Sequence, residues 1–361
     1  MKKHILLLFV LILLLTACAP QTPLPEGTEA PNPITITDAL GRQVTLPAAP
    51  QRIVITGKAL VMIADAVYTF PEAPGRIIGI GNAGQGSSNF ISLIDPNYAQ
   101  KAVLENNAGV EQIAALQPDL VLLKSYLAES VGNPIEAIGI PVVYVDFETP
   151  EQYRRDLSIL GQIFQDQTRA AQVSAYYQER VEQIQQAVDK AAARPRVLML
   201  YYSDKDGSVA FNVPPLGWMQ TQMVQLAGGD PVWEEANASN GWIQVTLEQV
   251  AAWDADQIFI ISYNTNPSDV VAGLESDPNW QALRAAQDGK LYAFPADLYS
   301  WDQPDTRWIL GLTWLAGRLH PELFPRLNMV AEAQSFYQNL YGLDAAFFEQ
   351  NILPTFKGDL P

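Results

Sequence analysis

Histidine and cysteine, which often serve as bases, nucleophiles and metal ligands, are almost absent from this chain. There is one Cys and there are two His in 361 residues. This scarcity excludes disulfides, iron–sulfur clusters, Cys-based zinc sites and multi-His metal sites within one chain. His4 lies in an apolar leader, and His320 precedes Pro321, where we expect a helix end that faces water. We therefore expect no catalytic residue, no metal ligand and no cofactor.

Carboxylates are the remaining groups that could support an enzyme. The chain has 39 Asp and Glu, and two of them would suffice for glycoside hydrolysis. No spacing marks such a pair. A secreted lipoprotein hydrolase that uses carboxylates therefore stays as the alternative of another class.

Aromatic and polar side chains in predicted loops are more informative. Ligands of open α/β sheets collect beyond the carboxyl ends of the strands, so side chains that follow strands can face one another across a cleft. For each aromatic residue, packing in the core is the alternative. In the C-terminal half these residues are Tyr202, Trp218, Trp242, Tyr263 and Trp301. In the N-terminal half they are Lys58, Asn82, Gln85, Ser125 and Tyr126.

Short apolar runs that alternate with helical patterns must position these loops. Runs that are apolar on both faces and alternate with helices indicate parallel sheets covered on each side. The first run follows a predicted hairpin around Leu40-Gly41. The predicted strands are 52–56, 76–81, 120–124 and 142–146 in the first half, and 197–202, 257–263 and 291–294 in the second.

The stretch between the two sets of strands has no strand signal. It predicts a helix at 151–164 and a longer one at about 168–192, and Arg194-Pro195 ends the longer one. The longer helix is polar at most positions, as expected of an element that bridges two bodies. We expect an N-terminal lobe at 34–166, a connecting helix at 167–194 and a C-terminal lobe at 195–361 that closes with helices at 306–319, 329–341 and 344–351.

An internal repeat supports two related lobes. VEQIAALQPDLVLL (Val110–Leu123) aligns without a gap with LEQVAAWDADQIFI (Leu247–Ile260). Each copy predicts a short helix that begins at a Glu, then a loop, then a buried strand. Chance similarity between two generic units is the alternative. The repeat places Glu111 and Glu248 at equivalent positions.

The overall composition narrows the classes of partner. The 22 Lys and Arg are outnumbered by the 39 Asp and Glu, which gives a net charge of −17 and a pI near 4.5. Because nucleic acids are bound mainly through Lys and Arg, no nucleic-acid partner is expected. Apolar residues make up 48% of the chain, and its length exceeds the usual need of one core.

The first residues resemble a lipoprotein signal peptide. A basic start precedes the apolar run 5–15, which is too short for a bilayer span of about 20 residues. The sequence Leu15-Thr16-Ala17-Cys18 resembles the lipobox of bacterial lipoproteins. That resemblance implies removal of residues 1–17 and lipidation of Cys18, with diacylglycerol and palmitate. An ordinary cysteine after a signal peptide is the alternative.

Residues 18–33 are rich in proline and predict a semi-extended tether behind this anchor. The anchor and tether together imply an extracytoplasmic protein on a membrane, on its periplasmic or outer face.

Several blocks of the folded part resemble one family. These are ITDALGRQVTLPAAPQRIVI, the repeat, IGIPVVYVD, LAGGDPVW and SWDQPDTRWILGLTWLAGRLHPELF. In this order they are similar to the iron-siderophore and cobalamin type of ABC-transporter substrate-binding protein, over residues 34–345. The resemblance implies two Rossmann-like lobes with mainly parallel sheets, one long interdomain helix and a ligand cleft between the lobes. It implies a binding protein, not an enzyme.

The resemblance also implies partners. A monomer would deliver a metal chelate to the transmembrane subunits of a permease, and Glu111 and Glu248 match the family's docking glutamates. A branch that binds zinc or manganese through a His-rich cluster is excluded by the missing histidines. A ferric siderophore is favoured; Lys58, Lys124, Lys205 and Arg307 could hold an anionic one. Cobalamin or another corrinoid, haem and an oxyanion remain alternatives.

Overall fold

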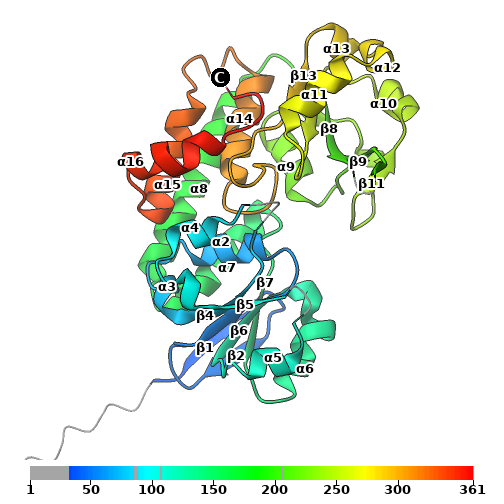
Figure 1. Ribbon diagram of the computed structural model, residues 1–361. Helices are drawn as coiled ribbons and strands as arrows, with labels where there is room; N and C mark the ends of the chain where they lie inside the picture. Colours follow the sequence, from blue (N-terminus) through cyan, green and yellow to red (C-terminus); the bar gives the residue numbers. More distant parts are fainter. Residues whose placement is uncertain (1–31, 85–87, 106–107, 205–206, 361) are drawn as a thin grey trace, which may run out of the picture.

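The computed structural model describes residues 32–84, 88–105, 108–204 and 207–360. Two α/β lobes lie one above the other in Figure 1 and are joined by the long helix α8. This arrangement confirms the predicted fold class.

The N-terminal lobe is built on a five-stranded parallel sheet in the order β5-β4-β3-β6-β7. One face packs against α5 and α6, and the other against α2 and α7. Alternate residues of a strand point to opposite faces, so strands covered on both sides are apolar at consecutive positions, as in the first four residues of β6 (LVLLK). The strands are β3 (Ile53–Ile55), β4 (Ile77–Gly81), β5 (Ala102–Leu104), β6 (Leu120–Lys124) and β7 (Val142–Val145).

The helices of this lobe are α2 (Leu60–Val67), α3 (Ala73–Arg76), α4 (Phe90–Ile94), α5 (Val110–Ala114), α6 (Asn133–Glu136) and α7 (Pro150–Phe164). The predicted hairpin is confirmed as antiparallel strands β1 (Ile34–Thr37) and β2 (Gln43–Leu46). Arg42 fastens it to the lobe, because its guanidinium lies 2.8 Å from both the Asp38 and the Glu136 carboxylates.

The C-terminal lobe contains a mixed sheet in the order β11-β9-β8-β12-β13, with β10 beside β8. Strands β8, β12 and β13 are parallel, whereas β9 and β11 continue the sheet in antiparallel pairings. The strands are β8 (Arg196–Ser203), β9 (Ala210–Val213), β10 (Asp230–Pro231), β11 (Ile243–Val245), β12 (Gln257–Ile261) and β13 (Leu291–Ala293).

The helices of this lobe are α9 (Met219–Leu226), α10 (Leu247–Trp253), α11 (Pro267–Glu275), α12 (Pro278–Gln281), α13 (Arg284–Gln287), α14 (Trp308–Leu319), α15 (Met329–Tyr341) and α16 (Ala345–Phe347). Strands β5, β9, β10 and β11 were not predicted. They have only two to four residues each, so the neighbouring strand decides their conformation more than their own sequence does.

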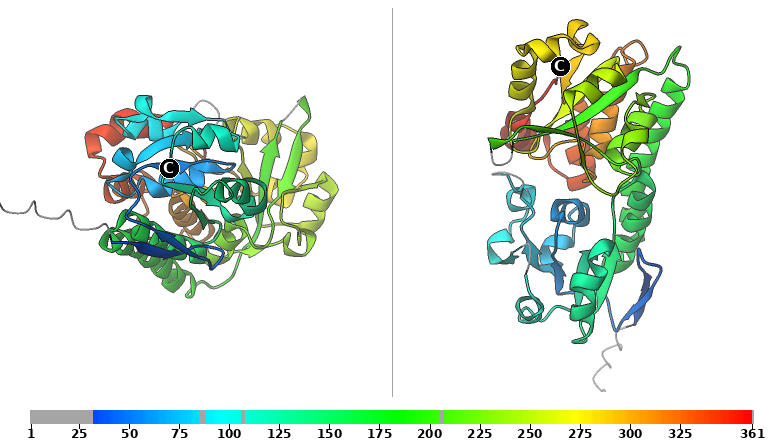
Figure 2. Two further views of the ribbon diagram at one scale, coloured as in Figure 1. Left: turned by 90° about the horizontal axis from the view of Figure 1, so that it is seen from below. Right: turned by 90° about the vertical axis from the view of Figure 1, so that its right-hand side faces the viewer.

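The connecting helix α8 spans Gln167–Val188 and ends four residues before the predicted end at 192. Its 22 residues correspond to roughly 33 Å of helix. The Asp166 carboxylate caps its start by accepting the backbone N–H of Arg169 at 2.8 Å. Figure 2 (right) shows α8 in green along one side of both lobes. The helix is therefore a continuous strut between them.

Both copies of the repeat fold alike. α5 leads into β6, and α10 leads into β12. Residues Gln117 and Asp254, aligned in the repeat, both adopt a left-handed conformation, with φ of 50° and 42°. The two units thus share a helix, a left-handed turn residue and a strand in the same order.

A second correspondence lies beside each unit. Asp119 accepts the backbone N–H of Arg52 at 2.9 Å, and Asp256 accepts that of Arg196 at 2.8 Å. Each Arg then donates to a backbone carbonyl of the repeat helix or its turn. The Asp–Arg contact thus sets the register of β3 against β6 and of β8 against β12.

Candidate ligand-binding site

A groove lies between the two lobes beside α8. One cavity of about 510 Å³ is lined by the first turns of α7, by the middle of α8 and by Trp308 of α14. A second cavity of about 570 Å³ shares Glu151 and Val181 with it and reaches Leu216 and α9. We call these two cavities the interlobe groove. Its walls come from both lobes, but none of the described residues predicted to contact the ligand lines it.

A smaller polar pocket of about 70 Å³ lies elsewhere between the lobes. Ser88 contributes from the N-terminal lobe, and the segments after β12 and β13 contribute from the C-terminal lobe. Hydroxyl groups of Ser262 and Ser300 and the ring of Tyr263 are part of its wall. Its volume suits a small ion or ordered water rather than a large ligand.

Four half-buried aromatic rings form a row on the C-terminal lobe. Tyr263 stacks on Tyr201 with ring centres 4.6 Å apart, and Tyr201 contacts Trp242 at 5.1 Å. Trp242 meets Trp218 edge to face at 5.6 Å. We call these four residues the aromatic cluster. Of these four residues, Tyr263 lines the polar pocket, and none lines the interlobe groove.

The structure brings together Trp218, Trp242 and Tyr263 of the predicted set and adds Tyr201, which the sequence analysis did not select. Tyr202 points to the other face of the sheet and packs against Phe211 at 5.8 Å. Successive residues of a strand alternate between faces, so only one of two adjacent tyrosines can join the cluster. The alternation of side chains along β8 indicates that only one of the two tyrosines can join the cluster. The sequence alone does not indicate which of the two it is.

The predicted residues of the N-terminal lobe lie in loops after the strands. Lys58 follows β3 and Asn82 follows β4, and both are exposed. Asn82 accepts the backbone N–H of Gly84 at 3.0 Å. Tyr126, after β6, is 57% exposed. Gln85 lies outside the described residues.

Two polar side chains at the end of β6, Lys124 and Ser125, are engaged by carboxylates of the same lobe. Lys124 is buried, and its ammonium donates to Glu148 at 2.5 Å and to the carbonyl of Asp146. Ser125 donates to the Asp146 carboxylate, which also forms an ion pair with Arg155 at 2.6 Å. The Lys124 charge is therefore neutralised within the lobe. Lys205, another lysine expected to hold an anionic ligand, lies outside the described residues.

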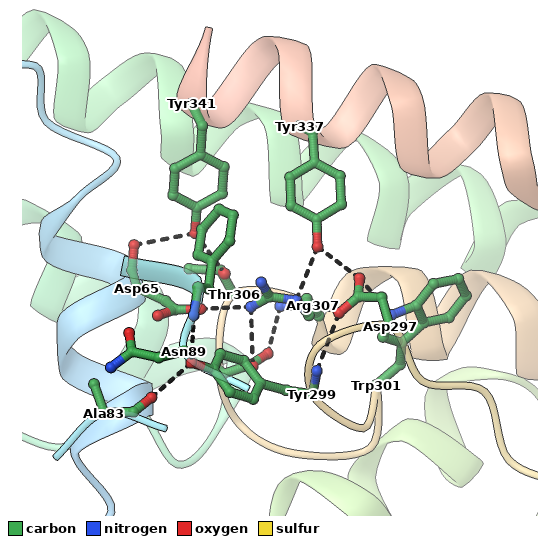
Figure 3. A network of polar contacts seen from close by, with 12 residues as sticks. Asp65, Ala83, Asn89, Asp297, Tyr299, Trp301, Thr306, Arg307, Tyr337 and Tyr341 are labelled. Atoms are coloured by element: carbon green, nitrogen blue, oxygen red, sulfur yellow. Dashed lines mark hydrogen bonds and ion pairs between the residues drawn. The ribbon is translucent and has the colours of Figure 1, made fainter. Parts of the chain in front are cut away.

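Arg307 is fully buried and serves the contact between the lobes (Figure 3). Its guanidinium lies 2.5 Å from Asp65 of the N-terminal lobe, 2.8 Å from Asp297 and 3.2 Å from Asp305. Burial alone would lower the pKa of Arg307, but Tyr337 and the three carboxylates raise it, so the side chain stays charged. The prediction that Arg307 contacts the ligand is wrong. Its guanidinium is buried and is paired with three carboxylates inside the protein.

Trp301 is also fully buried, and its indole Nε1 donates to Asp297 at 3.0 Å. It packs edge to face on Phe356 rather than joining the aromatic cluster. The neighbouring Tyr299 reaches across to the N-terminal lobe, where its hydroxyl donates to the Ala83 carbonyl at 2.6 Å and accepts from the backbone N–H of Phe90 at 2.8 Å. This loop therefore joins the lobes, and Trp301 is removed from the ligand surface.

Glu111 and Glu248 are exposed in the first turns of α5 and α10. In both helices the following Gln reaches back to the N-cap residue, with Gln112 accepting the N–H of Gly109 and Gln249 that of Thr246. In α10 the Thr246 hydroxyl also accepts the N–H of Gln249, which completes a capping box. Hydrogen bonds from its own backbone N–H and from the Thr246 hydroxyl lower the pKa of Glu248. The two carboxylates are thus exposed and occupy equivalent positions in the two units.

The described part of the chain contains no cluster of three or more His, Cys, Asp and Glu side chains that could hold a metal. His320 is only 2% exposed, with Nε2 3.3 Å from the Gly228 carbonyl, so the expectation that it faces water is wrong: α14 ends against the lobe rather than in solvent. Within the described ranges, the helices are too short or too polar to cross a membrane. The leader, Cys18 and the tether up to residue 31 lie outside those ranges.

Comparison with known proteins agrees with this architecture. The molybdate-binding protein MolA of Haemophilus influenzae is 26% identical over 335 residues, which is 85% of this chain and 90% of MolA. Its molybdate-bound structure superimposes with a TM-score of 0.70 at 22% identity, covering 86% of this chain and 98% of that one.

Two further relatives differ in their named ligands. The probable siderophore-binding lipoprotein YfiY of Bacillus subtilis is 23% identical over 81% of this chain and 90% of its own length. The vitamin B12-binding protein of Yersinia pseudotuberculosis is 27% identical over 60% of this chain and 79% of its own length. A model of the periplasmic binding protein family matches residues 86–298, more than half of the chain. Together with the two lobes and the interlobe groove, this match shows that the chain belongs to the periplasmic binding protein family.

Proposed function

We propose that this protein is the extracytoplasmic substrate-binding component of an ABC importer and that it captures a metal–organic chelate between its lobes. The observation that carries this proposal is the aromatic cluster, a row of four half-buried rings of which Tyr263 lines the polar pocket between the lobes. Half-buried rings in a row offer apolar faces to an organic ligand. Lys58, Asn82, Ser125 and Tyr126, together with Gln85, are the proposed contacts from the N-terminal lobe.

The charges near the strand ends favour a ligand held by its organic surface. Lys124 and Arg307, two of the cations expected to hold an anion, are paired with carboxylates inside the protein. A small oxyanion would have to compete with those carboxylates. A ferric siderophore presents carbon-rich arms around its metal and can rest on aromatic faces without such competition. Corrinoids and haem have the same requirement and remain alternatives within this proposal.

Oxyanion binding is the second candidate, and one relationship favours it. MolA, which is named for binding molybdate, aligns with 85% of this chain. The polar pocket, at about 70 Å³, has the size for a single small ion.

Identification of the bound molecule tests the proposal. The protein purified from its native host should carry an organic chelate visible by mass spectrometry and by its absorption spectrum. Purified protein should bind the matching compound in a one-to-one complex, without turnover, when titrated with ferric siderophores, cobalamin, haemin and molybdate. Binding of molybdate alone would support the oxyanion candidate, and turnover of a glycoside would support the hydrolase.

Transport requires contact with a membrane permease. We propose that Glu111 and Glu248 meet arginines of the transmembrane subunits, because an exposed carboxylate stands at the same place in both structural units. Charge-assisted Arg–carboxylate pairs suit such a docking face. We further propose that the protein acts as a monomer held at the membrane by lipid on Cys18.

A further inference from the structure

The buried carboxylate of Asp302 is hydrogen-bonded to Tyr263 of the aromatic cluster. Asp302, in the loop between β13 and α14, is fully buried. Its Oδ2 accepts the Tyr263 hydroxyl at 2.8 Å and the Gln220 side-chain amide at 3.0 Å. Its Oδ1 accepts the Ser300 hydroxyl at 2.6 Å. Three neutral donors thus converge on one carboxylate that neither lines the groove nor belongs to the Arg307 network.

Tyr263 is the link between Asp302 and the cluster. Its hydroxyl proton is directed inward to the carboxylate, while its ring stacks on Tyr201 at an interplanar angle of 28°. Burial and the adjacent Asp302 raise the pKa of Tyr263 well above its usual value. The hydrogen bond fixes the position of the Tyr263 ring. Tyr201 packs against this ring and against Trp242, so the position of Tyr263 also constrains the packing of Trp242.

This arrangement decides what the cluster can offer to a ligand. Bare ferric iron is a hard cation that binds tyrosine as phenolate, so each such bond requires loss of the phenol proton. Loss of the Tyr263 proton would leave two negative charges within hydrogen-bond distance in a buried site, which is strongly unfavourable. Ring faces remain available for contact, whereas the Tyr263 oxygen does not.

We propose that Asp302 is a positioning residue: it holds the Tyr263 hydroxyl inward so that the aromatic cluster accepts a preassembled organic chelate by its ring faces and does not bind bare ferric iron through the Tyr263 oxygen. This inference rests on the proposed function for its ligand class. The role of Asp302 toward Tyr263 can nevertheless be measured without any ligand.

Three variants test the positioning role. Asp302→Ala removes the acceptor, Asp302→Asn keeps an oxygen that can accept the Tyr263 hydroxyl, and Ser300→Ala removes a different donor from the same carboxylate. Near-ultraviolet circular dichroism reports the packing of aromatic rings, and the far-ultraviolet spectrum checks folding. Asp302→Ala should lose most of the cluster's near-ultraviolet signal, whereas Asp302→Asn and Ser300→Ala should retain it. An unchanged near-ultraviolet spectrum in folded Asp302→Ala would overturn the positioning role.

Ferric iron supplied as ferric nitrilotriacetate tests the second part. Wild-type protein at neutral pH should show no visible tyrosinate-to-iron charge-transfer band. A band that appears in the wild type and disappears in Tyr263→Phe would overturn the proposal. Neither experiment depends on the natural ligand. A failure to find any bound chelate would count against the proposed function and leave the Asp302–Tyr263 relationship standing.

Discussion

Arg307 of the C-terminal lobe and Asp65 of the N-terminal lobe form a fully buried ion pair, with 2.5 Å between Nη1 and Oδ2. The two residues are 242 positions apart in the sequence. Tyr341 adds a hydrogen bond from its hydroxyl to the Asp65 carbonyl at 3.1 Å. The lobes are therefore joined by a buried polar seam as well as by the helix α8. This seam predicts small relative movement of the lobes, because separating them would expose unpaired charges.

Arg307→Met should strongly destabilise the protein, because it leaves three carboxylates buried without their cation. Removal of one partner of a buried pair costs about 3–5 kcal/mol. Denaturant unfolding followed by circular dichroism measures the loss. Arg180→Met is the matched control, since Arg180 forms a longer, partly exposed pair with Glu332 at 3.8 Å and should lose less than about 1 kcal/mol. Equal losses in the two variants would contradict a special role for the seam.

Asp65 should make the stability depend on pH. Burial raises the pKa of its carboxyl to about 6, and nearby Asp297 adds to the rise against the lowering effect of Arg307. Because the folded protein holds this proton more tightly than the unfolded chain, the Asp65 contribution to stability is fully present near pH 4 and is lost as the pH rises through about 6. The slope from one such proton is at most about 1.4 kcal/mol per pH unit.

Asp65→Asn replaces the titrating carboxyl with a neutral amide. The free energy of unfolding of this variant should therefore depend less on pH between pH 4 and 6 than that of the wild type. The free energy of unfolding of both proteins, measured across that range, gives the comparison. Parallel curves for the two proteins would show that Asp65 does not titrate there.

Trp218 and Trp242 should contribute directly to ligand binding. Replacement of either by Ala should weaken binding by about 1–3 kcal/mol, the scale of an aromatic anchor. Titration calorimetry with the identified ligand measures the change, and quenching of tryptophan fluorescence on titration supports it. Trp253→Ala is the control, because Trp253 ends α10 at the opposite edge of the sheet from the cluster. Wild-type affinity in both cluster variants would place the ligand elsewhere.

The double variant Glu111→Arg/Glu248→Arg should keep ligand affinity but lose uptake through the reconstituted transporter, because attraction to permease arginines becomes repulsion. Loss of favourable charge at the helix starts should lower the stability of the protein only slightly, because both side chains are exposed. Glu179→Arg/Glu275→Arg makes the same change of charge at exposed positions on α8 and α11 and should transport normally. Wild-type uptake by the first variant would leave these glutamates with a helix-capping role alone.

Cys18→Ser should release the protein from membranes into the soluble extracytoplasmic fraction. The reason is that a serine at this position cannot accept the thioether-linked lipid. Fractionation and mass spectrometry of the N-terminal peptide check the result. Membrane retention of the variant, with no lipid on the wild-type peptide, would contradict the anchor.

Local patterns in the sequence determined much of the fold. The apolar runs of β3, β6, β7 and β12 predict buried parallel strands because both faces of each strand are covered. The repeat Val110–Leu123 and Leu247–Ile260 predicts two related units, since each copy carries its own cap, turn and strand. The loop after β12 carries Tyr263, and two other predicted aromatic residues, Trp218 and Trp242, lie in the same aromatic cluster.

Only the tertiary structure decided which side chains at that edge are free for a ligand. Tyr201 rather than Tyr202 joins the aromatic cluster because the parity of a strand is set by the elements packed on its two faces. Arg307 and Trp301 are loop residues of the expected type, yet both are engaged inside the protein. Asp65 of the other lobe pairs with Arg307, and Asp297 of the same loop accepts the Trp301 indole N–H. A pairing across 242 residues leaves no local pattern, because it depends on how the two lobes meet and not on the neighbours of either residue along the chain.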